Sequence, residues 1–327
     1  MSFVEEVEGA NIVAERIANV RPGEHVLIVG DWRSGAVTDR LAAGIHTAGA
    51  EPAVILMQPR EDEGNEPPAT VAAAMKEADV VVSVPDRAIG HSAAAKRALE
   101  SGTRFVAMGT LSLEKLCSDG LRADFEALGP NVEAMAERFT AAETARLTSE
   151  NGTDLTLNLA GRPGNGLSCT VSEPGEFTVA YCAEANVTPV PEGTDGRVVF
   201  DGSIPSLGIG LLDEDVVVDV EDGQVTSIEG GEGARKVERV WDRYDDPAVR
   251  QAAELAVGMN PNLSGITGEF INDRGVDGVV HVGFGTSSNL GGENRTPLHF
   301  DCTIRWSTLE LDGETVLEDR TFVGLDD

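Results

Sequence analysis

The sequence predicts an α/β protein in which an N-terminal open parallel sheet is followed by a mostly antiparallel, β-rich domain. Two observations carry this prediction. In the first 145 residues, short continuous apolar runs alternate with segments of helical spacing, which is typical of parallel strands buried on both faces. Later, Asp-Gly and Asn-Gly turns separate strand-like segments, which favours antiparallel hairpins. The domains are therefore expected at 1–145 and 146–327.

The N-terminal domain is expected to contain four buried strands connected by helices. The apolar runs are HVLIVG (25–30), AVILM (53–57), VVVSVP (80–85) and RFVAM (104–108). Helical spacing predicts helices near 5–19, 34–48, 69–78, 90–101 and 122–145. The loop after the first strand lacks the glycine spacing of a nucleotide site, so Asp31 and Arg33 are interpreted as the start of a helix, with a ligand crevice as the alternative.

The C-terminal domain is predicted from strand-like segments joined by glycine turns. These segments are NGTDLTLNLAGR (151–162), GRVVFDG (196–202), VVVDVEDGQVTSI (216–228) and STLELDGETV (307–316). One helix is expected to interrupt them, at PAVRQAAELAVG (247–258).

Composition excludes several classes of protein. The net charge is −31, with acidic residues spread along the whole chain, which indicates adaptation to a salt-rich, halophile-type cytoplasm. The same charge would repel nucleic acid and anionic membranes, so neither is expected as a partner. No apolar run is long enough to span a bilayer, and the acidic N-terminus does not resemble a secretory signal, so a cytoplasmic location is expected. The four scattered cysteines are expected to be free thiols.

The histidines give the clearest chemical signal, because the chain has only five. Two of them lie in one glycine-rich stretch, DGVVHVGFGTSSNLGGENRTPLHFD (277–301). In a strand, residues two apart share a face, so His299 and Asp301 are predicted to present an imidazole and a carboxylate together. With His281 they form a plausible ligand set for zinc, iron or manganese. His91, at a predicted helix start, is a weaker candidate for reaching this site.

Two glutamates stand among small and apolar residues. Glu254 lies in PAVRQAAELAVG, and Glu184 lies in VAYCAEANVTPVPEG. Burying a carboxylate in such surroundings costs several kcal/mol unless a cation compensates it. The alternative for each glutamate is a solvated position on an amphipathic element.

These motifs resemble, in order and character, those of the M29 metallo-aminopeptidases, the aminopeptidase T group. Glu184 precedes the proline turn VTPVPEGTDG, and Glu254 begins ELAVGMNP, the counterpart of ELGIG-N-P in that family. His281 begins HVGFG where the family has HIALG, and His299 with Asp301 matches its final HxD. The resemblance covers most of the chain. The family's metal-site tyrosine has no counterpart in TSSN (286–289).

The resemblance implies an aminopeptidase that removes N-terminal residues from peptides by a metal-activated water. It implies two divalent ions, Zn, Co or Mn, held by Glu184, Glu254, His281, His299 and Asp301. The two glutamates are the candidate catalytic residues, because carboxylates can bridge both ions. The resemblance also implies a homodimer acting on a peptide or another small-molecule substrate.

Two alternatives remain open. Ring-cleaving dioxygenases resembling 2,5-dihydroxypyridine dioxygenase share this architecture and use one ferrous ion. In that case His281, His299 and Asp301 form a two-histidine, one-carboxylate triad, for which the missing tyrosine is irrelevant. The second alternative is a metal-binding protein without activity. The number and identity of the bound metal ions discriminate between hydrolase and oxygenase.

Overall fold

The computed structural model describes residues 2–61, 64–90, 92–288 and 290–325. The chain forms two compact units, one of 1–127 with 167–181, the other of 128–166 with 182–327. The α/β fold class predicted from the sequence is confirmed, with a parallel sheet in one unit and antiparallel sheets in the other. The predicted domain boundary at residue 145 falls within the second unit and stays a prediction about separately folding domains.

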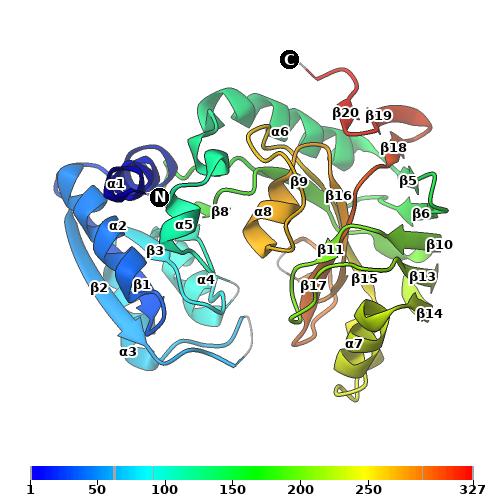
Figure 1. Cartoon of the computed structure of the whole chain (residues 1–327), viewed down its shortest axis with the longest axis horizontal. Coiled ribbons are helices and arrows are strands. Elements are labelled where there is room, and N and C mark those ends of the chain that lie inside the picture. The colour runs from blue at the N-terminus through cyan, green and yellow to red at the C-terminus, as the bar shows by residue number, and fades with distance from the viewer. Residues whose placement is uncertain (1, 62–63, 91, 289, 326–327) are drawn as a thin grey trace. The chain divides into compact units, whose positions relative to one another are not determined.

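The first unit is built on a five-stranded sheet of order β2-β1-β3-β4-β8, and every neighbouring pair in it is parallel. Its strands are β1 (His25–Asp31), β2 (Glu51–Met57), β3 (Val80–Ser83), β4 (Arg104–Ala107) and β8 (Phe177–Val179). Its helices are α1 (Phe3–Ile12), the π-helix η1 (Val13–Ile17), α2 (Gly35–Thr47), α3 (Ala69–Glu77), α4 (Ala93–Glu100), α5 (Leu113–Leu116) and the 3₁₀-helix η2 (Asp119–Arg122). Figure 1 traces this alternation of strand and helix in the blue and cyan part of the chain.

The second unit contains the antiparallel strands that the turn pattern predicted. One sheet has the order β14-β13-β10-β6-β5-β18-β19-β20, a second β17-β16-β15-β9-β7, and β11 pairs with β12. The strands are β5 (Thr144–Thr148), β6 (Asp154–Asn158), β7 (Gly164–Leu167), β9 (Glu184–Val187), β10 (Val190–Phe200), β11 (Ser203–Ile204), β12 (Gly210–Leu211), β13 (Val216–Glu221), β14 (Gln224–Gly230), β15 (Ala252–Gly258), β16 (Val280–Gly285), β17 (His299–Ile304), β18 (Thr308–Leu311), β19 (Glu314–Glu318) and β20 (Thr321–Phe322).

The helices of this unit differ from the prediction. They are α7 (Glu232–Trp241), the 3₁₀-helix η3 (Pro247–Arg250) and α8 (Phe270–Gly275), while α6 (Phe125–Ala141) begins just before the unit. The helix predicted at 247–258 is wrong, because only its first turn is helical and 252–258 is the fully buried strand β15. A strand buried on both faces has no alternating pattern, so its short apolar run is indistinguishable from a buried helix.

The smaller antiparallel sheet has two chemically different faces. On one face Phe284 of β16 pairs across the strands with Phe300 of β17. Their rings lie 5.9 Å apart, and each lies 5.9 Å from the buried ring of Trp241 on α7. Phe200 of β10 completes this aromatic core, 6.0 Å from Phe284. The residues that alternate with these phenylalanines project from the opposite face.

Replacing Phe284 with alanine is expected to lower the free energy of unfolding by about 3–5 kcal/mol, because it empties the centre of a packed aromatic cluster. Urea unfolding of purified protein, followed by circular dichroism, measures the loss. Leu211→Ala is the control, since Leu211 is 48% exposed and its truncation should cost about 0.5 kcal/mol. Equal losses in the two variants would contradict this account of the core.

Among the described residues, no helix has the length and apolar character needed to cross a membrane.

Candidate metal centre

The two histidines and the aspartate predicted as ligands project from the same face of neighbouring strands. In the pairing of β16 with β17, Gly283 lies opposite Asp301, His281 lies two residues before Gly283, and His299 lies two residues before Asp301. Residues two apart in a strand share a face, so all three side chains lie on the side away from the aromatic core. The same-face relation expected for the HxD motif therefore follows from the register.

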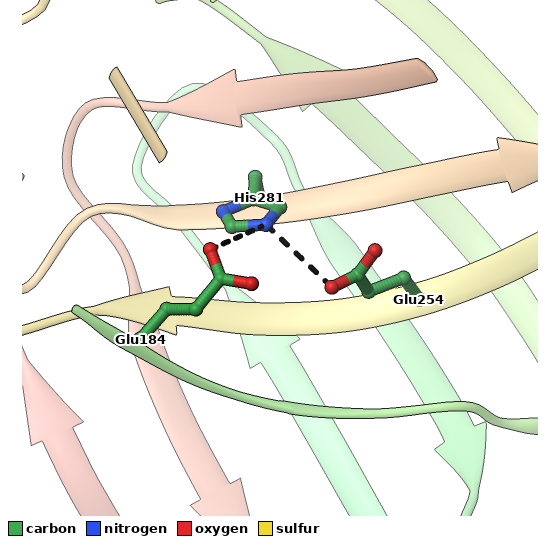
Figure 2. Close-up of side chains that lie close together, drawn as sticks. All are labelled: Glu184, Glu254 and His281. Carbon is green, nitrogen blue, oxygen red and sulfur yellow. Dashed lines mark ion pairs between the residues drawn. The ribbon is translucent and has the colours of Figure 1, made fainter. Parts of the chain in front are cut away.

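The two glutamates reach this face from the other side of β16. Glu254 of β15 lies opposite Gly283, and Glu184 of β9 lies opposite Gly258, four residues after Glu254. Both carboxylates are fully buried. Figure 2 shows them turned toward the ring of His281. The structure thus brings together all five side chains that the sequence singled out.

The side chains form two overlapping groups with the spacing of metal ligands. His281 Nε2 lies 3.9 Å from both Glu184 Oε2 and Glu254 Oε1. His299 Nε2 lies 3.1 Å from Glu254 Oε2 and 3.0 Å from Asp301 Oδ1. Within each group the ligand atoms lie within 4.8 Å of one another, and Glu254 belongs to both. Glu254 therefore lies between the two histidines.

Arg274 also lies in this cluster, although its sequence context did not single it out. It lies on α8, its side chain is 7% exposed, and its Nη2 lies 2.6 Å from Glu184 Oε1 and 3.6 Å from Glu254 Oε1. Its Nε lies 3.3 Å from Asp301 Oδ2. In the sequence, INDRGVDG (271–278) has the composition of a polar turn, so no local signal marks the arginine as buried. We refer to these six residues, Glu184, Glu254, Arg274, His281, His299 and Asp301, as the acid–histidine centre.

Several buried atoms of the centre have no hydrogen-bond partner among the described residues. They are Glu184 Oε2, Glu254 Oε1, Arg274 Nε, both nitrogens of His281, and Asp301 Oδ2. Buried polar atoms without partners are rare and costly. Here carboxylate oxygens and imidazole nitrogens converge, which is the ligand chemistry of a divalent metal ion. The residues present therefore fit a metal.

The orientation of His299 supports the same conclusion. Its Nδ1 lies 2.8 Å from the carbonyl oxygen of Thr286. A carbonyl only accepts hydrogen bonds, so Nδ1 carries the proton and donates it. This contact fixes the ring so that Nε2 faces the carboxylates of Glu254 and Asp301. A metal ion bound there would take the place of the proton on Nε2. A backbone carbonyl holding the distal nitrogen of a histidine is the usual support of a metal ligand.

Burial and neighbouring charges shift the pKa values of the centre. Burial lowers the pKa of His281 to about 4, so that this ring is neutral at pH 7. Burial raises the pKa of Glu184 to about 7, although Arg274 opposes that rise. Burial alone would raise the pKa of Asp301, but Arg274 and His299 hold it below its usual value. Burial alone would lower the pKa of His299, but Asp301 and Glu254 raise it well above its usual value, so without a metal this ring carries a positive charge toward the carboxylates.

Gly283 lies next to three of the candidate ligands. A Cβ atom on Gly283 would lie 2.8 Å from Asp301 Oδ1, 3.0 Å from Glu254 Cβ and 3.1 Å from His299 Cε1. These contacts are closer than such atoms normally approach, so a side chain here would displace the candidate ligands. The absence of a Cβ at this position leaves room for the three groups to meet.

Gly283→Ala is expected to weaken metal binding by about 10–100-fold while the protein stays folded, because the methyl group displaces ligands without removing them. Competition with a chromogenic chelator measures the affinity. Gly265→Ala is the matched control, since a Cβ at Gly265 has nothing within 4 Å. Unchanged metal affinity in Gly283→Ala would show that the ion does not bind at this face.

A chain of amides orients the Glu184 carboxylate, in addition to Arg274. Asn186, two residues along β9, donates from Nδ2 to Glu184 Oε1 over 3.2 Å. Asn165 of β7 in turn donates to Asn186 Oδ1 over 2.9 Å and to the carbonyl of Leu290 over 3.1 Å. With Oε1 held from two sides, Oε2 is the oxygen left facing His281.

Asp31 and Arg33, the candidates in the first unit, make structural contacts. Asp31 accepts hydrogen bonds from the backbone N–H groups of Arg33 and Asp86, each over 2.8 Å. Arg33 forms an ion pair with Asp86 over 2.5 Å. These contacts tie the end of β1 to the segment after β3, which supports the structural interpretation. His91 lies outside the described residues.

Fold and site together define a metal-dependent enzyme with an α/β unit and an antiparallel β unit carrying a buried acid–histidine centre. The chain belongs to the 2,5-dihydroxypyridine 5,6-dioxygenase family, whose model matches residues 14–324.

Individual relatives agree with this assignment. Over 268 residues the chain is 24% identical to the 2,5-dihydroxypyridine 5,6-dioxygenase of Pseudomonas putida KT2440, covering 73% of this chain and 76% of that protein. The solved structure of 2,5-dihydroxypyridine dioxygenase from Pseudomonas putida KT2440 matches with a TM-score of 0.83 and 18% identity, over 100% of this chain and 99% of the other. Wild-type AmpT from Thermus thermophilus matches with a TM-score of 0.71 and 16% identity, over 98% and 99%.

The aminopeptidase prediction is therefore wrong, and with it the expectation of a hydrolase or protease. The family match and the curated relative both indicate a dioxygenase. The likeness to AmpT, at 16% identity, concerns the fold alone. The motifs suggested the wrong reaction because carboxylate and histidine ligands in this order can bind several divalent metals on this fold. The expectation that the chain uses a metal survives the correction.

Proposed function

We propose that the chain is a ring-cleaving dioxygenase that uses one ferrous ion to open a dihydroxylated pyridine ring or a close relative of it. The family match over residues 14–324 carries this proposal. The acid–histidine centre supports it, because two histidines and a carboxylate project from one face of β16 and β17, and such a ligand set suits non-haem iron.

The ligands proposed for the ion are His281, His299 and Asp301, which share one face of β16 and β17. Glu254 lies beside both histidines. Ferrous iron supplies redox chemistry with dioxygen that amino-acid side chains lack. The chain's own contribution is to orient both imidazoles. Burial keeps His281 uncharged, and the Thr286 carbonyl fixes the ring of His299.

The chain's residues also define how a substrate reaches the centre. His299 is 23% exposed, whereas the side chains of Glu184, Glu254, His281 and Asp301 are at most 1% exposed. A ring substrate is therefore expected to approach beside His299. The carboxylates of Glu184 and Glu254 are more buried than His299 and could hold a proton released from a ring hydroxyl.

Purified protein reconstituted anaerobically with Fe(II) tests the proposal. On exposure to oxygen with 2,5-dihydroxypyridine, we expect oxygen uptake and loss of the ring's ultraviolet absorbance in equal amounts. The same protein loaded with Zn(II) is the control and should be inactive, because zinc has no redox chemistry. An iron-loaded, folded chain that consumes no oxygen with any dihydroxylated pyridine, or one that cleaves aminoacyl anilides, would overturn it.

A further inference from the structure

The guanidinium of Arg274 lies inside the acid–histidine centre, among its three carboxylates. It contacts Glu184, Glu254 and Asp301, with nitrogen–oxygen distances of 2.6, 3.6 and 3.3 Å. The oxygen of Glu254 that faces it, Oε1, is also the one that faces His281. Arg274 therefore shares Glu254 Oε1 with His281, and it also contacts the aspartate beside His299.

The backbone that carries Arg274 is held close to the sheet. A Cβ on Gly258 of β15 would lie 2.6 Å from the carbonyl oxygen of Arg274, and a Cβ on Gly275 would lie 2.6 Å from Cys182 Cα. Two glycines thus permit an approach that larger residues would block. The neighbouring Asp273 accepts hydrogen bonds from Ser203 Oγ over 2.6 Å and from the Gly268 N–H over 2.8 Å. These contacts fix the position of the Arg274 backbone without any contribution from its ion pairs.

Counting charges shows how many metal ions the centre accommodates. Three buried carboxylates contribute −3, and Arg274 contributes +1, which leaves −2 when both histidines are neutral. One divalent ion brings the sum to zero, whereas two would leave +2. Buried charge that is not compensated is strongly unfavourable, so the neutral combination is preferred. Without the arginine the sum is −3, which one divalent ion would bring to −1 and two would bring to +1, so the charge would no longer oppose a second ion.

We propose that Arg274 is a built-in cation that replaces a second metal ion and restricts the centre to one divalent ion per chain. This inference deepens the proposed function, on which it rests for the presence of a metal. It explains how a member of a dioxygenase family can carry ligand motifs that suggest a site for two ions. Arg274 is a positioning and charge-balancing residue and does not itself ligate the ion.

The opposing interpretation is that Arg274 forms an ordinary structural ion pair. A structural pair needs one carboxylate, and Glu184 at 2.6 Å would suffice. The guanidinium instead approaches oxygens of three acids, two of which have no hydrogen-bond partner among the described atoms, namely Glu254 Oε1 and Asp301 Oδ2. Burial alone would lower the pKa of Arg274, but the three carboxylates raise it well above its usual value, so the positive charge is permanent.

The test is the number of Mn(II) ions bound per full-length chain, measured by elemental analysis after equilibration with excess Mn(II) and by electron paramagnetic resonance. Wild-type protein and Arg274→Lys, which keeps the charge, should each bind one ion and give an isolated mononuclear signal. Arg274→Met, which has similar length and no charge, should bind two. Two ions about 3.5–4 Å apart would give a spin-coupled signal.

Each outcome bears on the inference. Two ions in the wild type, or one ion in a folded Arg274→Met variant, would overturn it. If Arg274→Met is unfolded without metal, added Mn(II) should restore folding, and failure to do so would also overturn it. Failure of the proposed function is recognised separately. A wild-type chain that binds one ion but does not consume oxygen with dihydroxypyridines would contradict the proposed function, while the number of bound ions would still agree with this inference.

Discussion

Replacing His281 with alanine is expected to abolish both iron binding and ring cleavage. His281 is fully buried, both of its ring nitrogens lack hydrogen-bond partners among the described residues, and two carboxylates lie 3.9 Å from Nε2. Loss of a residue that merely supports a ligand weakens metal binding roughly 10–100-fold, and loss of the ligand itself should exceed this. Iron content after anaerobic reconstitution and the rate of oxygen uptake should fall together.

His25→Ala is the control for this experiment. The His25 side chain is 69% exposed in the other unit, so its loss should change neither iron content nor oxygen uptake. Circular dichroism of both variants verifies that they are folded. A His281→Ala variant that retains full iron and full turnover would show that His281 is a buried core histidine and not a ligand.

The second large effect concerns stability without metal. Arg274→Met is expected to lower the free energy of unfolding of the metal-free protein by about 3–5 kcal/mol, because it removes the one cation that contacts all three buried carboxylates. Urea unfolding in the presence of a chelator measures this loss. The loss should shrink when Mn(II) is added, since bound metal then supplies the missing charge.

Arg197→Met is the matched control. Arg197 also forms an ion pair with a carboxylate, Asp219 at 2.7 Å, but its side chain is 57% exposed. Exposed pairs of this kind contribute little, so the control should unfold at the wild-type urea concentration. If Arg274→Met is as stable as this control without metal, the carboxylates of the centre are not charged in the folded protein.

Strand periodicity was enough to predict much of the centre. In HFD (299–301) and HVGFG (281–285), alternation alone separates His and Asp from Phe, and the paired register brings them to one face. The need of Glu254 for a cation could also be anticipated, because a carboxylate in a buried apolar run needs one whether the run is a helix or a strand. The secondary structure around Glu254 could not be predicted, because β15 is buried on both faces and has no period that distinguishes a strand from a helix.

Tertiary contacts account for what the sequence did not reveal. Arg274 follows Asp273 in a segment with turn-like composition, and only the close approach of α8 to β15 buries it. The helix α7 did carry a local signal, because Ala234, Val237 and Trp241 recur at helical spacing and are all buried. The type of reaction could not be predicted from the sequence motifs, because the same ligands support either hydrolysis or oxygenation.

The alternation along β17 also links assembly of the protein to its chemistry. Sliding β17 by one residue against β16 would turn Phe300 and Cys302 toward the metal, and His299 and Asp301 into the aromatic cluster. Such a misfolded chain would bury two charged groups in hydrocarbon and lose the ion in the same event. A chain that acquires iron has therefore also aligned this strand correctly, so metal content reports on the quality of refolded material.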